Sequence, residues 1–184
     1  MEQEQEREFV VLIDEKNNII GTMLKSEVHG RETPLHRAFS TFIFRKSDKK
    51  LLLQQRSHVK KTWPLMWSNS CCGHPKPNED TVSAAKRRLD FELGLQPLWI
   101  EEVAPYQYCF THKGVMENEI CPILIGMVDS EPIINTEEVE AVMWVDWNWF
   151  VEETKKHPEK YSEWCVEEVA ILDKLSRVNE LFIS

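Results

Sequence analysis

Short apolar segments separated by polar turns dominate the first third of the chain. Such segments lie at residues 9–13, 19–24, 38–45 and 51–56, and each pair is joined by a short polar stretch. This pattern predicts two β-hairpins, because strands are short, rich in β-branched and aromatic residues, and bounded by turn formers. The segment 58–78 has no steady hydrophobic period and predicts a loop-rich region, where binding groups tend to lie.

The hydrophobic period changes to that of a helix after residue 80. Val82, Ala85 and Leu89 share one helical face, Asp80 precedes them and Gly94 follows them. An Asp accepts hydrogen bonds from the first N–H groups of a helix, and a Gly adopts the left-handed conformation that ends one. The sequence therefore predicts a helix that begins after Asp80 and ends before Gly94.

The remaining pattern completes a layered fold. It predicts strands around residues 100–110, 119–127 and 140–146, a helix at 148–156, and a last helix that begins near Ser162. The apolar stripe of that last helix consists of Cys165, Val169, Leu172 and Leu175. Strands and helices mixed in this way indicate an α/β or α+β fold with a mixed sheet.

The composition limits the kinds of partner. The 184 residues carry a formal net charge of −9, and we expect one domain over residues 1–184 with the charged lead-in 1–8 frayed. An acidic chain is poorly suited to bind nucleic acid or an anionic membrane, and no apolar run approaches the ~20 residues of a membrane helix. The five cysteines and an N-terminus with no apolar signal segment predict a cytoplasmic protein with free thiols.

Two adjacent cysteines precede Gly73 in the loop-rich region. Cys71 and Cys72 are a poor disulfide pair, so they are core residues, part of a metal site, or a nucleophile on a tight turn. On an extended backbone their side chains point in opposite directions, and Gly73 lets the chain turn sharply so that Cys72 faces a pocket. In a cationic, metal-rich pocket the Cys72 thiol would ionise more easily than usual.

Three histidines and two carboxylates suit a shared metal. His29 and His36 lie in one stretch that contains Gly and Pro, His74 follows the cysteine pair, and Glu117 and Glu119 are two positions apart. On a strand, both carboxylates lie on one face. Imidazole and carboxylate groups in this number suit Mn²⁺, Zn²⁺ or a Mg²⁺-like ion. The spacing alone is also compatible with surface or hydrogen-bonded histidines.

Basic residues occur in the same regions. They lie near loops or on the predicted helix and are Lys25, Arg56, Lys60, Lys61, Arg87 and Arg88. In an acidic protein such a set can bind a phosphate or diphosphate, although solvated surface charge explains most Lys and Arg side chains. Composition and spacing thus indicate, at most, an enzyme that combines a thiol, a metal and a phosphate group.

Several motifs, found in order, carry a close resemblance to one family. They are Gly21-Thr22…Lys25, Pro34-Leu35-His36-Arg37-Ala38-Phe39-Ser40, Gln55-Arg56-Ser57…Lys60-Lys61-Thr62-Trp63-Pro64, Trp67-Ser68-Asn69-Ser70-Cys71-Cys72-Gly73-His74-Pro75, Glu92-Leu93-Gly94 and Glu117-Asn118-Glu119-Ile120-Cys121-Pro122. From about residue 9 to residue 164 the chain resembles the type 1 isopentenyl-diphosphate isomerases. The resemblance implies the Nudix fold, an α/β/α sandwich around a mixed β-sheet.

The Nudix box, G-x5-E-x7-R-E-U-x-E-E-x-G-U, is present with two changes. Gly73, Glu79 and Arg87 match it, but Arg88 and Phe91 stand where the box has glutamates. Hydrolases of this fold use the acidic residues to hold metals for attack on a diphosphate. The loss of two carboxylates therefore argues against the alternative of a Nudix diphosphate hydrolase. A non-enzymatic metal-binding module, the second alternative, would need neither the basic residues nor an acid/base pair.

The resemblance implies a role for each matching residue. One divalent metal, Mn²⁺ or another ion such as Zn²⁺, would be bound by His29, His36, His74, Glu117 and Glu119. Mg²⁺ on the substrate diphosphate would be held by Glu92 and the Cys72 carbonyl, and the diphosphate would be contacted by Lys25, Arg56, Lys60 and Arg88. The acid/base pair would be Cys72 and Glu119, with Tyr108 and Trp164 completing the pocket.

The implied reaction converts isopentenyl diphosphate to dimethylallyl diphosphate, in isoprenoid biosynthesis. One proton is added and another removed on opposite faces of the substrate, through a tertiary carbocation and without a redox cofactor. Glu119 beside the metal fits the proton donor and Cys72 the opposite face, while Trp164 can stabilise the cation through its π face. We expect this small diphosphate as the partner, with no nucleic acid or membrane bound, and a monomeric protein.

Overall fold

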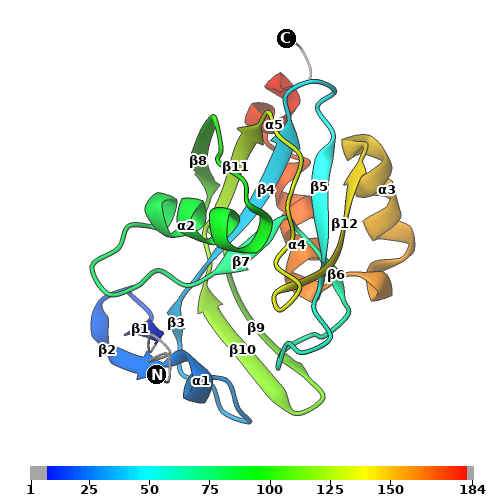
Figure 1. The fold of residues 1–184 in the computed structure, drawn as a ribbon. Coiled ribbons are helices and arrows are strands. Elements are labelled where there is room, and N and C mark those ends of the chain that lie inside the picture. Colours follow the sequence, from blue (N-terminus) through cyan, green and yellow to red (C-terminus); the bar gives the residue numbers. More distant parts are fainter. Residues whose placement is uncertain (1–7, 182–184) are drawn as a thin grey trace, which may run out of the picture.

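Within residues 8–181, the part that the computed structural model describes, the strands form two mixed sheets (Figure 1). The smaller sheet has the order β2 (Ile19–Leu24), β1 (Phe9–Ile13), β3 (His36–Arg37), β10 (Val115–Ile120) and β9 (Gln107–His112). The larger has the order β12 (Val139–Val145), β5 (Leu51–Arg56), β4 (Phe39–Arg45), β11 (Ile123–Val128) and β8 (Trp99–Ala104), with β6 (Trp67–Ser68) paired to β5 and β7 (Cys71–Gly73) paired to β4. Residues 1–7, most of the lead-in expected to be frayed, lie outside the described residues.

Helices cover both faces of the larger sheet (Figure 1). The helices are α1 (Lys25–Val28), α2 (Thr81–Leu93), α3 (Trp147–Lys156), α4 (Glu163–Leu172) and α5 (Ser176–Glu180), with a 3₁₀ turn at Pro158–Lys160. Ile43 of β4 lies in a buried cluster with Leu89 of α2, whereas its neighbour Phe42 lies in a second cluster with Phe150 of α3. The alternation of side chains along β4 thus fills both cores. The predicted layered fold around a mixed sheet is confirmed, and the smaller sheet is added to it.

The two predicted hairpins and the predicted helix are also confirmed. β1 and β2 pair antiparallel, as do β4 and β5. The Asp80 carboxylate accepts a hydrogen bond from the Ser83 N–H at 2.9 Å, and Gly94 adopts a φ of 60° after the last turn of α2. These caps define both ends of the helix that carries Arg88 and Glu92.

The strands predicted at 100–110 and 119–127 are wrong as single elements, because each is divided at a proline. Pro105 separates β8 from β9, and Pro122 separates β10 from β11. Proline has no N–H to donate to a sheet ladder, so the strand stops. In both cases the two halves belong to different sheets.

The chain passes from the smaller to the larger sheet twice, from β3 to β4 and from β10 to β11, and these two passages are adjacent. β3 pairs parallel with β10 in the smaller sheet, and β4 pairs parallel with β11 in the larger one. Between them, the Ala38 N–H donates to the Ile120 carbonyl at 2.9 Å and the Ser40 N–H donates to the Pro122 carbonyl at 3.1 Å. This bend brings Glu119 of the smaller sheet within 2.9 Å of His74, which directly follows β7 of the larger sheet.

The C-terminal helices differ from the prediction in detail. α3 begins at Trp147. Asp146 caps its first turn, because its side chain accepts a hydrogen bond from the Trp149 N–H at 2.9 Å. α4 ends at Leu172, so Leu175, expected on the stripe of one last helix, lies between α4 and α5. Among the helices described here, none has both the length and the apolar character needed to cross a bilayer.

Candidate functional site

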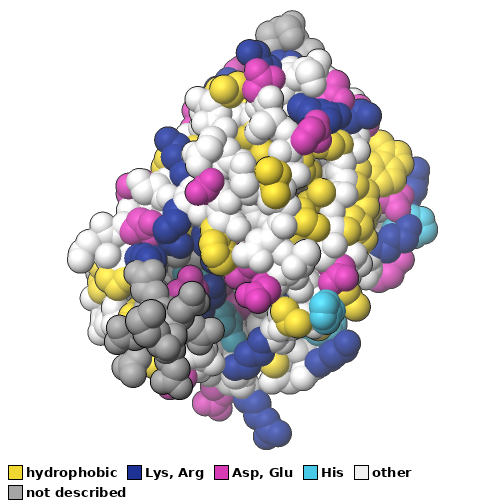
Figure 2. All heavy atoms as spheres, viewed as in Figure 1, with side chains coloured by type: hydrophobic (Ala, Val, Ile, Leu, Met, Phe, Trp, Pro, Cys, Tyr) yellow, Lys and Arg dark blue, Asp and Glu magenta, His cyan; other side chains and the backbone are white. Residues whose placement is uncertain are grey.

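A cavity of about 760 Å³ opens between the smaller sheet, α2 and α4. Its lining includes Lys25, His29, Arg56, Lys60, Cys72, His74, Arg88, Tyr108, Glu117, Glu119 and Trp164. Of the site residues predicted from the sequence, only His36 and Glu92 are outside this lining, and both are buried. Figure 2 shows histidine, basic and acidic side chains close together around a hollow in the lower part of the face in view.

The predicted histidines converge on one carboxylate. Ligand atoms of His29, His36, His74 and Glu119 all lie within 4.8 Å of one another. The Glu119 Oε1 is 3.1 Å from the His36 Nε2 and 2.9 Å from the His74 Nε2. Glu117 joins the group through its Oε2, 2.8 Å from the His29 Nε2.

Backbone pairing explains why these side chains meet. His36 and Glu119 are register partners on the parallel strands β3 and β10. Glu117 and Glu119 are both buried and lie on one face of β10, as the sequence predicted. His29 follows α1, and its backbone carbonyl accepts a hydrogen bond from the Lys61 Nζ at 2.6 Å.

The donor atoms of this cluster fit a divalent metal. Among the described residues, the buried His29 Nε2 and Glu117 Oε2 have no hydrogen-bond partner although they face each other. His36 can donate its Nδ1–H to the Pro34 carbonyl at 2.9 Å, which leaves the Nε2 lone pair directed at the cluster. Metal-bound histidines are commonly held in this way through the second ring nitrogen. The cluster is therefore compatible with binding a divalent ion.

The groups of the cluster shift one another's pKa. Burial lowers the pKa of His74 to about 3, so its imidazole is neutral, the form that binds metals. Burial also opposes protonation of His29, but the carboxylates of Glu117 and Glu119 outweigh it and raise its pKa to about 9. Burial opposes ionisation of Glu119 as well, yet the three histidines hold its pKa well below the ordinary value.

Cys71 and Cys72 point to opposite sides of β7, in agreement with the extended geometry. Cys71 is fully buried in the cluster under α2, whereas Cys72 lines the cavity. The Cys72 thiol donates to the Asn69 Oδ1 at 3.2 Å and lies 3.5 Å from the Ser40 hydroxyl. Burial, with the nearby Glu168 carboxyl, raises the pKa of the Cys72 thiol to about 12. The side chains of the protein by themselves therefore favour the protonated thiol, and the easier ionisation expected in a metal-rich pocket stays a prediction.

Gly73 serves a different purpose from the turn that was predicted. It is the last residue of β7 and does not adopt a positive φ. A Cβ atom placed there would lie 2.9 Å from the Cγ of Arg88 and 3.0 Å from the Cζ of Phe39. The glycine is required because the Arg88 side chain passes directly over the strand.

The wall of the cavity opposite α2 is aromatic and held by hydrogen bonds. The Tyr108 and Trp164 rings stack with centroids 5.7 Å apart. The Tyr108 hydroxyl donates to the Glu119 Oε2 at 2.7 Å. The Trp164 Nε1–H donates to the Asn69 Oδ1 at 3.2 Å, so Asn69 orients both this indole and the Cys72 thiol.

The four predicted phosphate contacts already have partners in the protein. Lys25 pairs with Glu8 at 2.6 Å, Lys60 pairs with Glu138, and Arg88 pairs with Glu92. Arg56 donates to the Thr62 carbonyl at 2.8 and 3.0 Å, and its guanidinium lies 5.5 Å from the centre of the Trp164 ring.

The sequence pattern did not identify three residues of the site. Asn69 lies inside a motif that carried the resemblance, so its position could have been noticed. Glu168 follows Trp164 by four residues and Cys165 by three, so helical spacing could have placed it on the buried face of α4, where it is fully buried. Glu138 lies in the polar segment before β12, where nothing in the local pattern distinguishes it.

Comparisons with known proteins agree with this geometry. The NUDIX domain model matches residues 34–165. The isopentenyl-diphosphate Delta-isomerase of Saccharopolyspora erythraea is 44% identical over 170 residues, covering 91% of this chain and 87% of that protein. The protein of the same name from Agromyces mediolanus is 41% identical over 167 residues, covering 90% of this chain and 81% of its own length.

A solved structure supports the fold alone. DR0079 from Deinococcus radiodurans superposes with a TM-score of 0.61 at 18% sequence identity, covering 81% of this chain and 90% of its own. The domain match spans most of the chain, and the curated relatives share about two residues in five over nearly its whole length. The chain therefore belongs to the isopentenyl-diphosphate Delta-isomerase family of NUDIX-domain proteins.

Proposed function

We propose that this protein interconverts isopentenyl diphosphate and dimethylallyl diphosphate by protonation and deprotonation. The observation that carries the proposal is that Glu119 and Cys72 line one cavity together with a group of cationic side chains. A double-bond shift of this kind needs one group to give a proton and another to take one. The cations supply the binding energy for the diphosphate that holds the reacting carbon atoms between these two groups.

The two proton-handling groups are kept in opposite states of protonation. The pKa of Cys72 is raised by burial, so its thiol carries a proton. The pKa of Glu119 is lowered by the histidines around it, so its carboxylate can accept one. The Tyr108 hydroxyl donates a hydrogen bond to the Glu119 Oε2, which fixes the orientation of the carboxylate in the cavity. Such a pair can exchange protons with a substrate in either direction.

Aromatic rings accommodate the carbocation. The Trp164 and Tyr108 side chains are buried and stacked, and both line the cavity. A cation above the face of a desolvated Trp is stabilised by about 2 kcal/mol or more. Water is excluded from a wall of this kind, so capture of the carbocation by water is suppressed.

Lys25, Arg56, Lys60 and Arg88 are assigned to the substrate diphosphate. We assign one divalent ion, Mn²⁺ or Zn²⁺, to the three histidines with Glu117 and Glu119, and Mg²⁺ to Glu92 and the Cys72 carbonyl. When bound, these ions supply positive charge beside the Glu119 carboxyl and on the diphosphate. We expect a cytoplasmic monomer that binds neither nucleic acid nor membrane.

Hydrolysis of a diphosphate is the less suitable function for this site. The guanidinium of Arg88 and the ring of Phe91, 5.0 Å apart, take positions where the Nudix box has carboxylates. Arg88 instead directs positive charge into the cavity, and it is buried beside Glu92. A cation at this place favours an intact diphosphate over the assembly of metal ions that hydrolysis requires.

The test is incubation of the purified protein with isopentenyl diphosphate in deuterated water, followed by NMR. We expect dimethylallyl diphosphate that carries deuterium, and we expect Cys72→Ser and Glu119→Gln to lose at least 10²-fold in rate. Release of phosphate or diphosphate without a shifted double bond would instead identify a hydrolase. Metal binding with no product at all would support a non-enzymatic module.

A further inference from the structure

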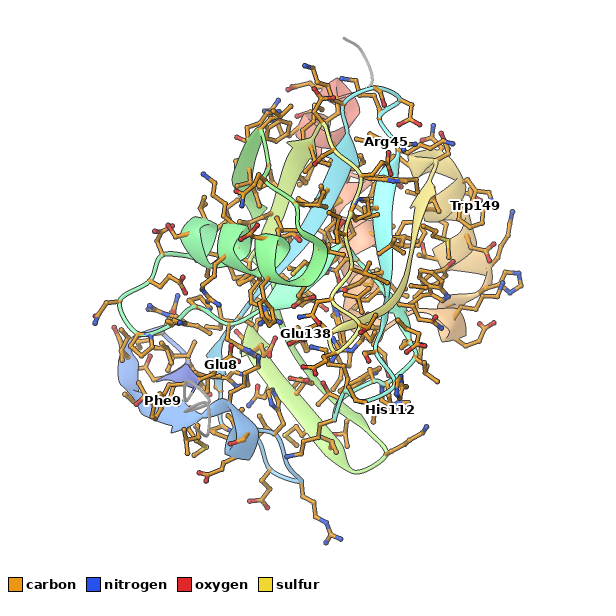
Figure 3. The ribbon with its side chains drawn as sticks, in the orientation of Figure 1. Glu8, Phe9, Arg45, His112, Glu138 and Trp149 are labelled. Atoms are coloured by element: carbon orange, nitrogen blue, oxygen red, sulfur yellow. The ribbon has the colours of Figure 1, made fainter. Side chains whose placement is uncertain are left out.

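Glu138 is a residue of the cavity that connects two of its cations, Lys60 and Arg88. Its Oε2 forms ion pairs with the Lys60 Nζ and, at 3.2 Å, with the Arg88 Nη2. Lys60 comes from the loop after β5 and Arg88 from α2, whereas Glu138 precedes β12. Figure 3 shows Glu138 near the centre of the molecule, between α2 and the smaller sheet, with Glu8 on the side of the chain start.

The backbone holds Glu138 in this place. Its carbonyl accepts a hydrogen bond from the Ser57 N–H at 3.1 Å, and its N–H donates to the Asn135 carbonyl at 3.0 Å. Asn135 in turn donates its N–H to the Glu92 carbonyl at the end of α2 at 2.9 Å. The carboxylate is therefore built on a segment that is tied to both elements that supply the cations.

Glu138 is also ionised. Burial opposes its ionisation, but Lys60 and Arg88 outweigh burial and lower its pKa below the ordinary value. At the place assigned to the diphosphate, three cations of the cavity pair with carboxylates: Lys25 with Glu8, Lys60 with Glu138, and Arg88 with Glu92, Glu138 and, at 3.8 Å, Glu8. Without ligand, the positive charges are largely neutralised by the protein itself.

We propose that Glu138 determines the ligand specificity of this subsite by making it a poor receptor for phosphate groups that arrive without a divalent cation. The proposal rests on the proposed function, because it takes Lys60 and Arg88 as diphosphate contacts. An anion that enters without a cation must compete with the Glu138 carboxylate for the N–H donors of Lys60 and Arg88. A diphosphate bound to Mg²⁺ carries its own positive charge, which offsets repulsion by Glu138 and can be shared with Glu92.

The experiment measures the affinity for inorganic diphosphate by calorimetry, with and without added Mg²⁺, on the purified protein with its own bound metal. In Glu138→Gln we expect metal-free diphosphate to bind about tenfold more tightly, because one like charge is removed from direct contact with the donors. Binding of the Mg²⁺ complex should change by about twofold or less, so the dependence of affinity on Mg²⁺ decreases.

Glu137→Gln is the matched control. Glu137 lines the same cavity and carries the same charge, but it is exposed and forms no ion pair with a described residue. Its affinity for metal-free diphosphate should change by about twofold or less. An equal gain in both variants would show a general effect of net charge, and weaker binding in Glu138→Gln would show that Glu138 only positions the cations. Either result overturns the proposal.

Two further measurements separate this proposal from the proposed function. Failure of the parent protein to bind Mg²⁺–diphosphate, or unchanged binding in Lys60→Met, would reject the diphosphate subsite and this inference with it. Binding by the parent that depends on Lys60, but without the gain in Glu138→Gln, would reject the role of Glu138 alone. Should Glu138→Gln fail to fold, Glu138→Asp takes its place, because it keeps the charge but moves it away from the N–H donors. Its affinity for metal-free diphosphate should then rise by about threefold.

Discussion

Tyr108 and Glu119 lie directly opposite each other on the β9–β10 ladder, and the Tyr108 hydroxyl donates to the Glu119 Oε2 at 2.7 Å. The other carboxylate oxygen faces the histidines. A hydrogen bond to the ionised form of a carboxyl lowers its pKa. In Tyr108→Phe we therefore expect the acid side of the pH–rate profile to shift to higher pH, with a loss of about tenfold or more in kcat. A variant with the parent profile would show that this hydrogen bond does not influence the proton transfer.

The two cysteines should differ sharply in their contribution to the reaction. Cys72→Ser replaces the thiol proton by a much less acidic hydroxyl proton and should lower the rate by about 10²-fold or more. Cys71→Val should cost little activity, since Cys71 is buried as a small apolar side chain under α2. Turnover of the two single variants is the measurement. A near-parent Cys72→Ser beside an inactive Cys71→Val would reverse the assignment.

Glu168 should reduce stability at neutral pH. The side chain is fully buried, and within the described residues its two oxygens have no hydrogen-bond partner. Burial raises its pKa well above 4.5, so the folded protein holds a proton that the unfolded chain releases. Stability contributed by that proton is present below pH 4.5 and is lost as pH rises toward the folded pKa.

Glu168→Gln removes this titration. Its free energy of unfolding should match that of the parent below about pH 4.5 and exceed it by about 1.4 kcal/mol more for each pH unit above, until the folded pKa is reached. Urea unfolding at several pH values tests this. A constant difference at all pH values would mean that Glu168 does not carry the proton.

Metal content should depend on the buried histidines. His36→Ala should lower bound divalent metal to well below one ion per chain and remove activity, because a ligand at the centre of the cluster is lost. His58→Ala is the control, since His58 is exposed, pairs with Glu140 and is not part of the cluster. Elemental analysis of both purified variants tests this, and full occupancy in His36→Ala would exclude His36 from the ligand set.

Local signals were sufficient for the hairpins, for α2 and for the position of the two cysteine side chains. They failed where tertiary packing decides. Pro105 and Pro122 could each have predicted the end of a strand from the sequence. That the chain changes sheet at both prolines depends on long-range packing. Gly73 was interpreted as a turn residue because the passage of Arg88 above it depends on how α2 docks. The predicted site residues came together, whereas their roles stay predictions.

Carboxylates were the hardest part of the site to predict. Glu8 and Glu138 line the cavity and Glu168 acts on Cys72, but the groups that each of them meets there are distant in sequence. A sequence pattern reports period and spacing along the chain, and an unpatterned glutamate in a polar segment is indistinguishable from solvated surface charge.

The bend where the chain passes from one sheet to the other has a consequence for how this enzyme can diverge. Glu119 belongs to the smaller sheet and Cys72 to the larger, so the two proposed proton-transfer groups are carried by different sheets that share one core. The backbone bonds from Ala38 to Ile120 and from Ser40 to Pro122 join these sheets. Substitutions that keep those two bonds in place should leave the reach between the two groups unchanged. A change in the bend should alter that reach, and with it the length of the allylic system that fits, while Glu119 and Cys72 themselves stay the same.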